Sequence, residues 1–186
     1  SNAYAEDAAH YLEDCIKNQD SSGGIIECII DGMPTGIGEP VFRKLDACLA
    51  QAVMSIGAVK GVEIGDGFQA AQACGSSNND SFYEKNGQIV KRSNHAGGVL
   101  GGLSDGSRII LRAAIKPTPS IAKEQETIDI YGNTTNITVT GRHDPVIVPR
   151  AVVVVESMAA VTIADLLIDN MSSKVEHLQK IYLKNL

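Results

Sequence analysis

The stretch Pro40-Val41-Phe42-Arg43-Lys44-Leu45-Asp46-Ala47-Cys48-Leu49-Ala50-Gln51-Ala52-Val53-Met54, followed by Val59-Lys60-Gly61-Val62-Glu63-Ile64, decides the fold class of this chain. Apolar side chains recur in the first segment with the 3.6-residue period of a helix, and its opening proline suits a first helical turn. The second segment is short and rich in β-branched residues, as in a strand. We therefore expect a helix over 40–54 that is followed closely by a strand over 59–64.

The rest of the chain mixes helix-like and strand-like segments without a strict β-α-β alternation. In chain order they are a helix over 5–18, a strand over 25–30, a glycine hairpin over 65–68, strands over 108–115, 127–131 and 136–140, a helix from after Pro149 to about 170, and a helical tail over 172–186. Such a mixture predicts an α+β fold.

Length and composition exclude several classes of protein. The 186 residues are 44% hydrophobic, enough for one sizeable core, and the formal net charge of −6 without a dense basic stretch argues against nucleic acid as the main partner. No apolar run approaches the roughly 20 residues of a membrane span, so we expect no membrane partner. The opening Ser1-Asn2-Ala3 resembles the remnant of a cleaved expression tag, which leaves 4–186 as a single domain.

The cysteines and histidines indicate neither a disulfide framework nor a metal site. The four cysteines are widely spaced, with no pair at redox-motif or metal-ligand separation, and three of them have apolar neighbours. We expect reduced thiols in a cytoplasmic protein. The four histidines include no i, i+4 pair, so we expect no metal.

Three polar islands interrupt the apolar sequence and suggest one composite site. They are Asn94-His95-Ala96-Gly97-Gly98, Lys116-Pro117-Thr118-Pro119-Ser120 and Gly141-Arg142-His143-Asp144-Pro145. Each combines turn-forming residues with groups that bind anions or move protons. The prolines of the second island stiffen the backbone that presents a lysine and two hydroxyls, as phosphate binding requires, although a surface turn has the same composition.

The other two islands carry alternatives of their own. The first island continues through further glycines to Gly101 and Gly102, and we call residues 94–102 the glycine island. Its glycines lack the spacing of a dinucleotide-binding loop. They fit either a flexible turn or a backbone that a flat ligand approaches closely. In the third island, Arg142 and Asp144 are two residues apart, so both point to the same side of an extended segment. They form either a structural salt bridge or a catalytic pair in which Arg142 binds an anion and Asp144 moves a proton.

Taken together and in this order, these segments strongly resemble the chorismate synthase family. The resemblance is carried by the three islands and by Gly36-Ile37-Gly38-Glu39-Pro40-Val41-Phe42, Leu45-Asp46-Ala47, Met54-Ser55-Ile56 and Ala58-Val59-Lys60-Gly61-Val62-Glu63-Ile64-Gly65, and it covers about residues 20–170. The chain resembles only the C-terminal half of that enzyme, because the glycine-serine-histidine-glycine motif, a second catalytic histidine and most substrate-binding arginines of the N-terminal half are absent. The resemblance implies part of a β-α-β sandwich with helices packed between antiparallel sheets.

The function implied by the resemblance is that of a carbon-oxygen lyase. The family converts 5-enolpyruvylshikimate 3-phosphate to chorismate and phosphate, the last step of the shikimate pathway towards aromatic amino acids. This anti-1,4-elimination needs reduced FMN, which NADPH reduces in some members, and the enzyme is a homotetramer. We expect the isolated chain to be inactive, because the missing half carries most of the counter-charges for the substrate.

Site residues follow from the same resemblance, motif by motif. Asp144 matches the acid that exchanges a proton with the flavin, and Arg142 would contact both the flavin and the anionic substrate. The remaining flavin contacts would be Gly57, Ala58, Gly101, Lys116, Pro117, Thr118, Pro119 and Ser120. The alternatives are a non-catalytic flavin- or phosphate-binding module, and a structural fragment that serves as an assembly face.

Overall fold

A three-stranded antiparallel sheet forms the centre of the computed structural model, which describes residues 2–141 and 143–183. Strand β7 (Ile109–Ile115) lies in the middle, between β1 (Gly24–Ile30) and β2 (Val59–Ile64). Alternate residues of β7 are buried, because successive side chains of a strand point to opposite faces. The apolar set Ile109, Leu111, Ala113 and Ile115 faces the core.

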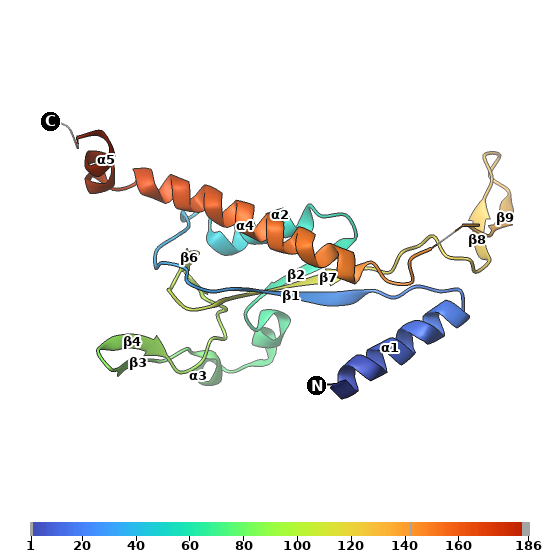
Figure 1. Ribbon diagram of the computed structural model, residues 1–186, viewed down its shortest axis with the longest axis horizontal. Coiled ribbons are helices and arrows are strands. Elements are labelled where there is room, and N and C mark those ends of the chain that lie inside the picture. Colours follow the sequence, from blue (N-terminus) through green and yellow to red (C-terminus); the bar gives the residue numbers. More distant parts are fainter. Residues whose placement is uncertain (1, 142, 184–186) are drawn as a thin grey trace.

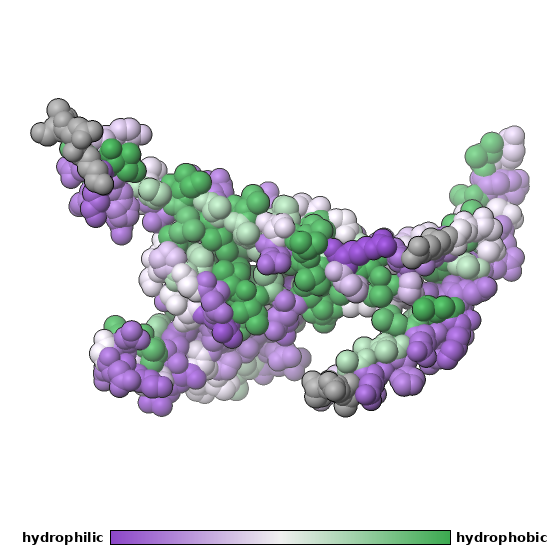
Figure 2. All heavy atoms as spheres, in the orientation of Figure 1, coloured by the Kyte–Doolittle hydropathy of each residue, from purple (hydrophilic) through white to green (hydrophobic). Residues whose placement is uncertain are grey.

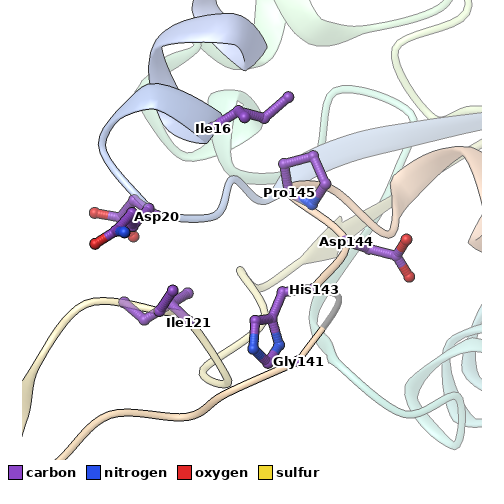
Figure 3. A pocket seen from close by; sticks show the side chains of 9 residues that line it. Ile16, Asp20, Ile121, Gly141, His143, Asp144 and Pro145 are labelled. Carbon is purple, nitrogen blue, oxygen red and sulfur yellow. The ribbon is translucent and has the colours of Figure 1, made fainter.

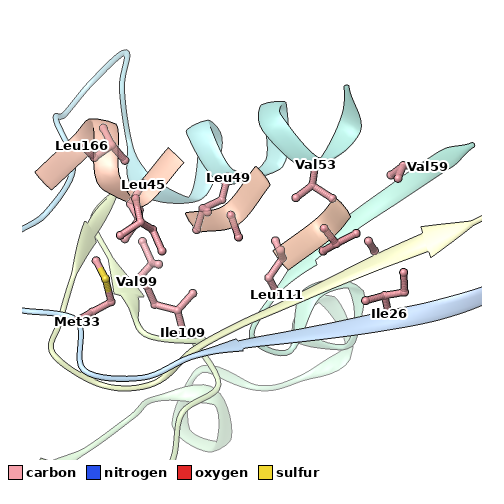
Figure 4. Packing of buried hydrophobic residues seen from close by; sticks show 14 of the residues in the cluster. Ile26, Met33, Leu45, Leu49, Val53, Val59, Val99, Ile109, Leu111 and Leu166 are labelled. Atoms are coloured by element: carbon pink, nitrogen blue, oxygen red, sulfur yellow. The ribbon is translucent and has the colours of Figure 1, made fainter. Parts of the chain in front are cut away.

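Two helices cover this apolar face of the sheet. Helix α2 (Leu45–Met54) and helix α4 (Val148–Ser172) pack together on it, and Figure 4 shows the side chains of both helices meeting those of the sheet. The buried residues of α2 and α4 recur at helical spacing, as Leu45, Leu49 and Val53 in α2 and Val155, Ala159, Ile163 and Leu166 in α4. This layer of helices on an antiparallel sheet confirms the predicted α+β fold.

Helix α4 is longer and more apolar than a half-buried helix requires. Its 25 residues contain an 18-residue window of mean hydropathy 2.1, so by length and composition it could cross a membrane. The sequence expectation missed this because Glu156 and Asp165 interrupt the apolar run. One side of α4 packs on β1 and α2, although only 17% of the apolar window is buried. Apolar side chains remain exposed along its other side, at Val152, Val153, Val161, Ile168 and Met171 (Figure 2).

The smaller elements project from this centre (Figure 1). Helix α1 (Asn2–Lys17) precedes β1, and α5 (Val175–Tyr182) follows α4. The chain between β2 and β7 forms, in order, the 3₁₀ helix η1 (Gly67–Gln72), helix α3 (Gly75–Asn78), the hairpin of β3 (Phe82–Lys85) and β4 (Gln88–Lys91), and the two-residue strands β5 (Val99–Leu100) and β6 (Leu103–Ser104). A second hairpin, β8 (Gln125–Ile128) and β9 (Thr134–Ile137), comes between β7 and α4 in the chain and projects at the far right of Figure 1.

Most predicted elements are present, and four differ from the prediction. Helix α2 begins at Leu45 instead of Pro40, because the backbones of Glu39 and Arg43 bond to each other in a tight turn that a helix cannot include. The hairpin predicted over 65–68 is wrong. The Glu63 side chain accepts a hydrogen bond from the Phe68 N–H at 3.0 Å, and the chain continues into η1. The strands predicted over 127–131 and 136–140 each lie two to three residues earlier, as β8 and β9.

Candidate functional site

The Lys116–Ser120 turn leaves the sheet beside the end of helix α2. The backbone N–H of Lys116 donates to the carbonyl of Ala58 at 2.9 Å, so the segment that precedes β2 meets the segment that follows β7. Ala58 has a φ of +72°, a left-handed conformation that residues other than glycine seldom adopt. The structure therefore brings together two segments that were predicted to bind the flavin, Gly57 and Ala58 in one and Lys116 in the other.

The segment before β1 connects this turn to the third polar island. The Ser21 hydroxyl donates to the Thr118 carbonyl at 2.6 Å, and the Ser22 N–H donates to the Pro145 carbonyl at 2.7 Å. Gly23 allows the close approach, because a Cβ atom there would lie 2.4 Å from the Ile115 carbonyl oxygen. The sequence analysis assigned no role to residues 21–24, whereas this segment joins two of the three islands.

A cavity of about 190 Å³ opens between these segments (Figure 3). Its walls come from the end of α1, from Ile121 and Ala122 after the turn, and from the third island, including His143 and Asp144. Surface pockets that enclose a drug-sized ligand usually measure about 300–1,000 Å³. This cavity can therefore hold only part of a cofactor or substrate.

Charged side chains flank the cavity in exposed pairs. The Asp144 carboxylate points away from the cavity in Figure 3 and lies 2.7 Å from Nη1 of Arg150, a partner that the sequence did not suggest. Lys123 Nζ lies 2.8 Å from Asp20 Oδ2, and the hydrogen bond from Lys123 lowers the pKa of that carboxyl. Arg142, the predicted partner of Asp144, lies outside the described residues.

One atom of the turn has the chemistry expected of a ligand contact. Thr118 Oγ1 is buried, and no group among the described residues forms a hydrogen bond with it. A buried hydroxyl without a partner costs free energy, so such groups often await a ligand or water. Lys116 is exposed in the same turn. The turn therefore offers a cation and a vacant hydroxyl, as an anionic group such as a phosphate would require.

The glycine island lies at the other end of the sheet. Gly101 and Gly102 form the tip of the β5–β6 hairpin, and both have positive φ, as a type I′ turn requires. The Gly102 carbonyl accepts a hydrogen bond from the Leu45 N–H at the start of α2, whereas Gly57 and Ala58 follow the end of that helix. Ten helical residues rise about 15 Å. The structure thus joins two of the three islands and leaves the glycine island roughly that far away.

Beside the glycine island lies a buried ionic cluster that the sequence analysis missed. Lys91 Nζ lies 2.6 Å from Asp105 Oδ2 and 3.3 Å from Asp80 Oδ2, and the three side chains are only 3%, 7% and 4% exposed. Burial alone raises the pKa of Asp80. Hydrogen bonds from the Ala96 N–H, the Ser93 hydroxyl and the His95 N–H, with the charge of Lys91, outweigh that effect and hold the pKa well below its ordinary value.

The signal for this cluster was the dipeptide Asn86-Gly87. These residues have φ of +55° and +80°, the positive values of a type I′ turn between β3 and β4. An expected hairpin at this position would have placed Lys91 at the end of a strand beside the glycine island. Among the described residues, no group of three or more histidine, cysteine, aspartate or glutamate side chains is arranged to hold a metal ion.

Comparisons with known proteins agree on one family. The family model for chorismate synthase matches residues 1–168. A chorismate synthase from Lachnoclostridium phytofermentans is 64% identical over 181 residues, which are 97% of this chain and 49% of that protein. One from Archaeoglobus fulgidus is 59% identical over 147 residues, 78% of this chain and 41% of that protein.

A solved structure supports the same assignment. A crystal structure of chorismate synthase matches with a TM-score of 0.73 at 33% sequence identity, and the match covers 94% of this chain and 46% of the other. The chain spans about half the length of the relatives it matches. Sequence and fold together show that the chain belongs to the chorismate synthase family.

Proposed function

We propose that this chain is the flavin-binding half of an enzyme that converts 5-enolpyruvylshikimate 3-phosphate to chorismate and phosphate. One structural observation carries the proposal beyond family membership: the turn with exposed Lys116 and the vacant Thr118 hydroxyl is bonded to Ala58 and, through Ser21 and Ser22, to the segment of Asp144. These are the segments in which the resemblance locates the flavin contacts and the catalytic acid.

The cofactor in this proposal is reduced FMN. When bound, it supplies electron density to an elimination in which substrate and product have the same net oxidation level. Lys116 provides a charge for an anionic group of the ligand, and Thr118 Oγ1 gains the hydrogen bond that it lacks. The exposed residues Gly57, Pro117 and Pro119 and the half-buried Ala58 and Ser120 present backbone and small side chains around them.

Asp144 holds or takes up the proton in this proposal. Its carboxylate is 34% exposed, so a proton can reach it, and the ion pair with Arg150 fixes its orientation. Arg142 is the proposed second cation for the flavin and substrate. A general acid or base must lie within hydrogen-bond reach of the atom that it serves. The hydrogen bonds from the serine segment to Thr118 and Pro145 supply that proximity by drawing the two islands together.

Gly101 contacts a different part of the ligand from Lys116. No atom lies within 4 Å of the position where a Cβ would stand at Gly101, so the turn presents a bare backbone to its surroundings. FMN is elongated, with a flat ring system and a phosphate at opposite ends of a ribityl chain. A ligand of this shape can extend along α2, from Gly101 near the start of the helix to Lys116 near its end, whereas a compact ligand could contact only one of them.

The remaining features of the proposal rest on the family alone. They are a role for residues 4–186 as one flavin-binding unit, a homotetrameric enzyme, reduction of the flavin by NADPH and a cytoplasmic location. The cavity of about 190 Å³ in one chain accords with a site that further chain or further subunits complete.

Flavin titration tests the proposal in a full-length protein that carries this sequence. Lys116→Ala should weaken FMN binding by about 1–3 kcal/mol, the range for a lost charge-assisted hydrogen bond. Gly101→Val should block the ligand, because the valine side chain would stand where the turn is open. Lys85→Ala, on the exposed β3–β4 hairpin, is the matched control and should leave FMN affinity unchanged.

The outcomes separate the enzyme from the alternative module. If Lys116→Ala lowers the affinity for inorganic phosphate but leaves the affinity for FMN at the wild-type value, the turn is a generic phosphate site and the flavin proposal fails. If Gly101→Val binds FMN normally, the glycine turn does not belong to the site.

A further inference from the structure

Lys91 is the centre of the contacts that surround the glycine island. It ends strand β4, and its ammonium group is almost wholly buried, with Nζ close to three oxygen atoms. These are Asp105 Oδ2 at 2.6 Å, Asp80 Oδ2 at 3.3 Å and Asn94 Oδ1 at 3.3 Å. An ammonium group has three N–H donors. Lys91 therefore donates hydrogen bonds to Asn94 and Asp105 and forms an ion pair with Asp80, which lie in three different parts of the chain between β2 and β7.

Two of these acceptors hold the backbone that leads into the β5–β6 hairpin. The Asp80 carboxylate also accepts the N–H groups of His95 at 2.8 Å and Ala96 at 3.0 Å. Asn94 Oδ1 accepts the Gly98 N–H at 2.9 Å, directly before β5. The entry to the hairpin is thus bonded to side chains that Lys91 itself holds.

The third acceptor holds the backbone that leaves the hairpin. Asp105 follows β6 directly, and its N–H donates to the Gly98 carbonyl at 3.1 Å, which closes the base of the hairpin. Its carboxylate also accepts the Ser107 N–H at 2.8 Å. Lys91 therefore contacts both the entry and the exit of the hairpin that carries Gly101 at its tip.

The hairpin tip itself is held on one side and open on the other. Gly102 is buried, its carbonyl accepts the Leu45 N–H at 2.8 Å, and a Cβ there would lie 2.5 Å from the side chain of Lys44. Gly101 is exposed with open space beside it. Because the hairpin strands have only two residues each, their own pairing supports the tip weakly. The tip therefore depends on contacts outside the hairpin, which are the bond from Leu45, the bonds of Ser104 to the segment 34–37, and the contacts at the base.

We propose that Lys91 is a positioning residue that holds the Gly101 turn in place for the flavin. This inference rests on the proposed function for the identity of the ligand, but the cluster and its contacts are independent of it. Without the ammonium group, the carboxylates of Asp80 and Asp105 would repel each other in a site that water scarcely reaches. They would move apart or take up protons, and either response changes the base of the hairpin.

The test compares Lys91→Met with Lys91→Arg and with Lys85→Met in the full-length protein, by flavin titration well below the melting temperature. Lys91→Met should raise the FMN dissociation constant by about tenfold or more, whereas Lys91→Arg, which keeps the charge, should stay within about threefold of wild type. Lys85→Met, on the same hairpin but exposed, should bind FMN as wild type does.

Amide hydrogen exchange without flavin gives a second readout. In Lys91→Met, the amides of His95, Ala96 and Gly98 should exchange faster, while those of the Lys116–Ser120 turn should not change. If Lys91→Met does not fold, Asp105→Asn replaces it and should produce the same two effects more weakly. A merely structural lysine would lower the melting temperature and leave both FMN affinity and loop exchange in the folded protein at wild-type values, which would overturn the proposal.

The failure of this inference can be told from the failure of the proposed function. If Gly101→Val weakens FMN and Lys91→Met does not, the glycine turn binds flavin without help from Lys91. If neither variant changes FMN affinity but loop exchange rises in Lys91→Met, Lys91 does hold the loop, and it is the assignment of Gly101 to the flavin site that is wrong.

Discussion

The two ends of strand β7 carry polar groups of opposite character. At its beginning, Lys91, Asp80 and Asp105 are nearly inaccessible to water and bond to one another. Beyond its end, the pairs Lys123–Asp20 and Arg150–Asp144 are exposed, with side chains that are 34–72% accessible. Buried charges fix the backbone around them, because every donor and acceptor must be satisfied, whereas exposed charges remain available to a ligand or a proton.

This difference assigns distinct tasks to the two ends. The buried cluster has used its donors on the loop that it holds, so it can position Gly101 but not bind a ligand. The other end has an exposed lysine, a carboxylate in contact with water and a buried Thr118 hydroxyl that lacks a partner among the described residues, so it has groups left over for a ligand or a proton. The proposed site therefore combines a rigid support with a reactive end.

The largest effect should come from breaking the buried cluster. Asp80→Ala leaves Lys91 with one carboxylate and removes the acceptor for the N–H groups of His95 and Ala96. Loss of one partner of a buried ion pair costs about 3–5 kcal/mol. We expect a lower melting temperature for the full-length protein, by calorimetry. Asp31→Ala breaks the exposed pair with Arg108 as the control and should change the melting temperature little. Equal effects of the two variants would refute the contrast.

The second prediction concerns the exposed end. Asp144→Asn keeps the shape of the side chain but removes the proton acceptor, so turnover in the full-length enzyme should fall by about 100-fold, or roughly 2.7 kcal/mol. FMN affinity should change little, because the amide still forms hydrogen bonds. Arg150→Met removes the ion-pair partner and serves as the control. If it lowers turnover as much as Asp144→Asn does, Asp144 acts through that pair instead of through proton transfer.

The sequence could predict the features that depend on local patterns, but it could not predict contacts between residues far apart in the chain. The strands β1, β2 and β7 were predicted because each is a short run rich in β-branched and other apolar residues, and α4 was predicted from apolar residues at helical spacing. The Lys116 and Asp144 islands were found because chemistry-bearing residues interrupt those periods. That these two islands meet depends on Ser21 and Ser22, whose contacts are between residues about a hundred positions apart in the chain. No local pattern encodes such contacts.

The missed parts have different physical causes. The turn of Glu39 and Arg43, which delays the start of α2, is closed by backbone hydrogen bonds that any residue type can form. The buried cluster was missed because a lysine and two aspartates in a polar stretch usually indicate solvated surface. Only their convergence shows that they are inside. The separation of the glycine island from the other two also follows from tertiary structure, since α2 and β7 set the distance.

The smallest expected effect is on acid stability, and it tests the same contrast by pH. The pKa values of Asp80 and Asp105 lie below the ordinary value of 3.8, because hydrogen bonds and Lys91 outweigh the effect of burial, which acts in the opposite direction. In the unfolded chain these carboxyls take up protons near pH 4, whereas in the native protein they do so only at lower pH. Their contribution to stability is therefore complete above about pH 4 and is lost as the pH falls through the native pKa values.

Thermal melting of the full-length protein at pH 6, 4 and 3 tests this prediction. The melting temperature should fall with pH, and it should fall less in Asp80→Asn, since that variant has one such carboxyl fewer. Asp31→Asn, which alters an exposed carboxyl, should leave the pH dependence at its wild-type slope. A wild-type slope in Asp80→Asn as well would mean that acid unfolds the protein through other carboxyls and that the cluster retains its protonation state.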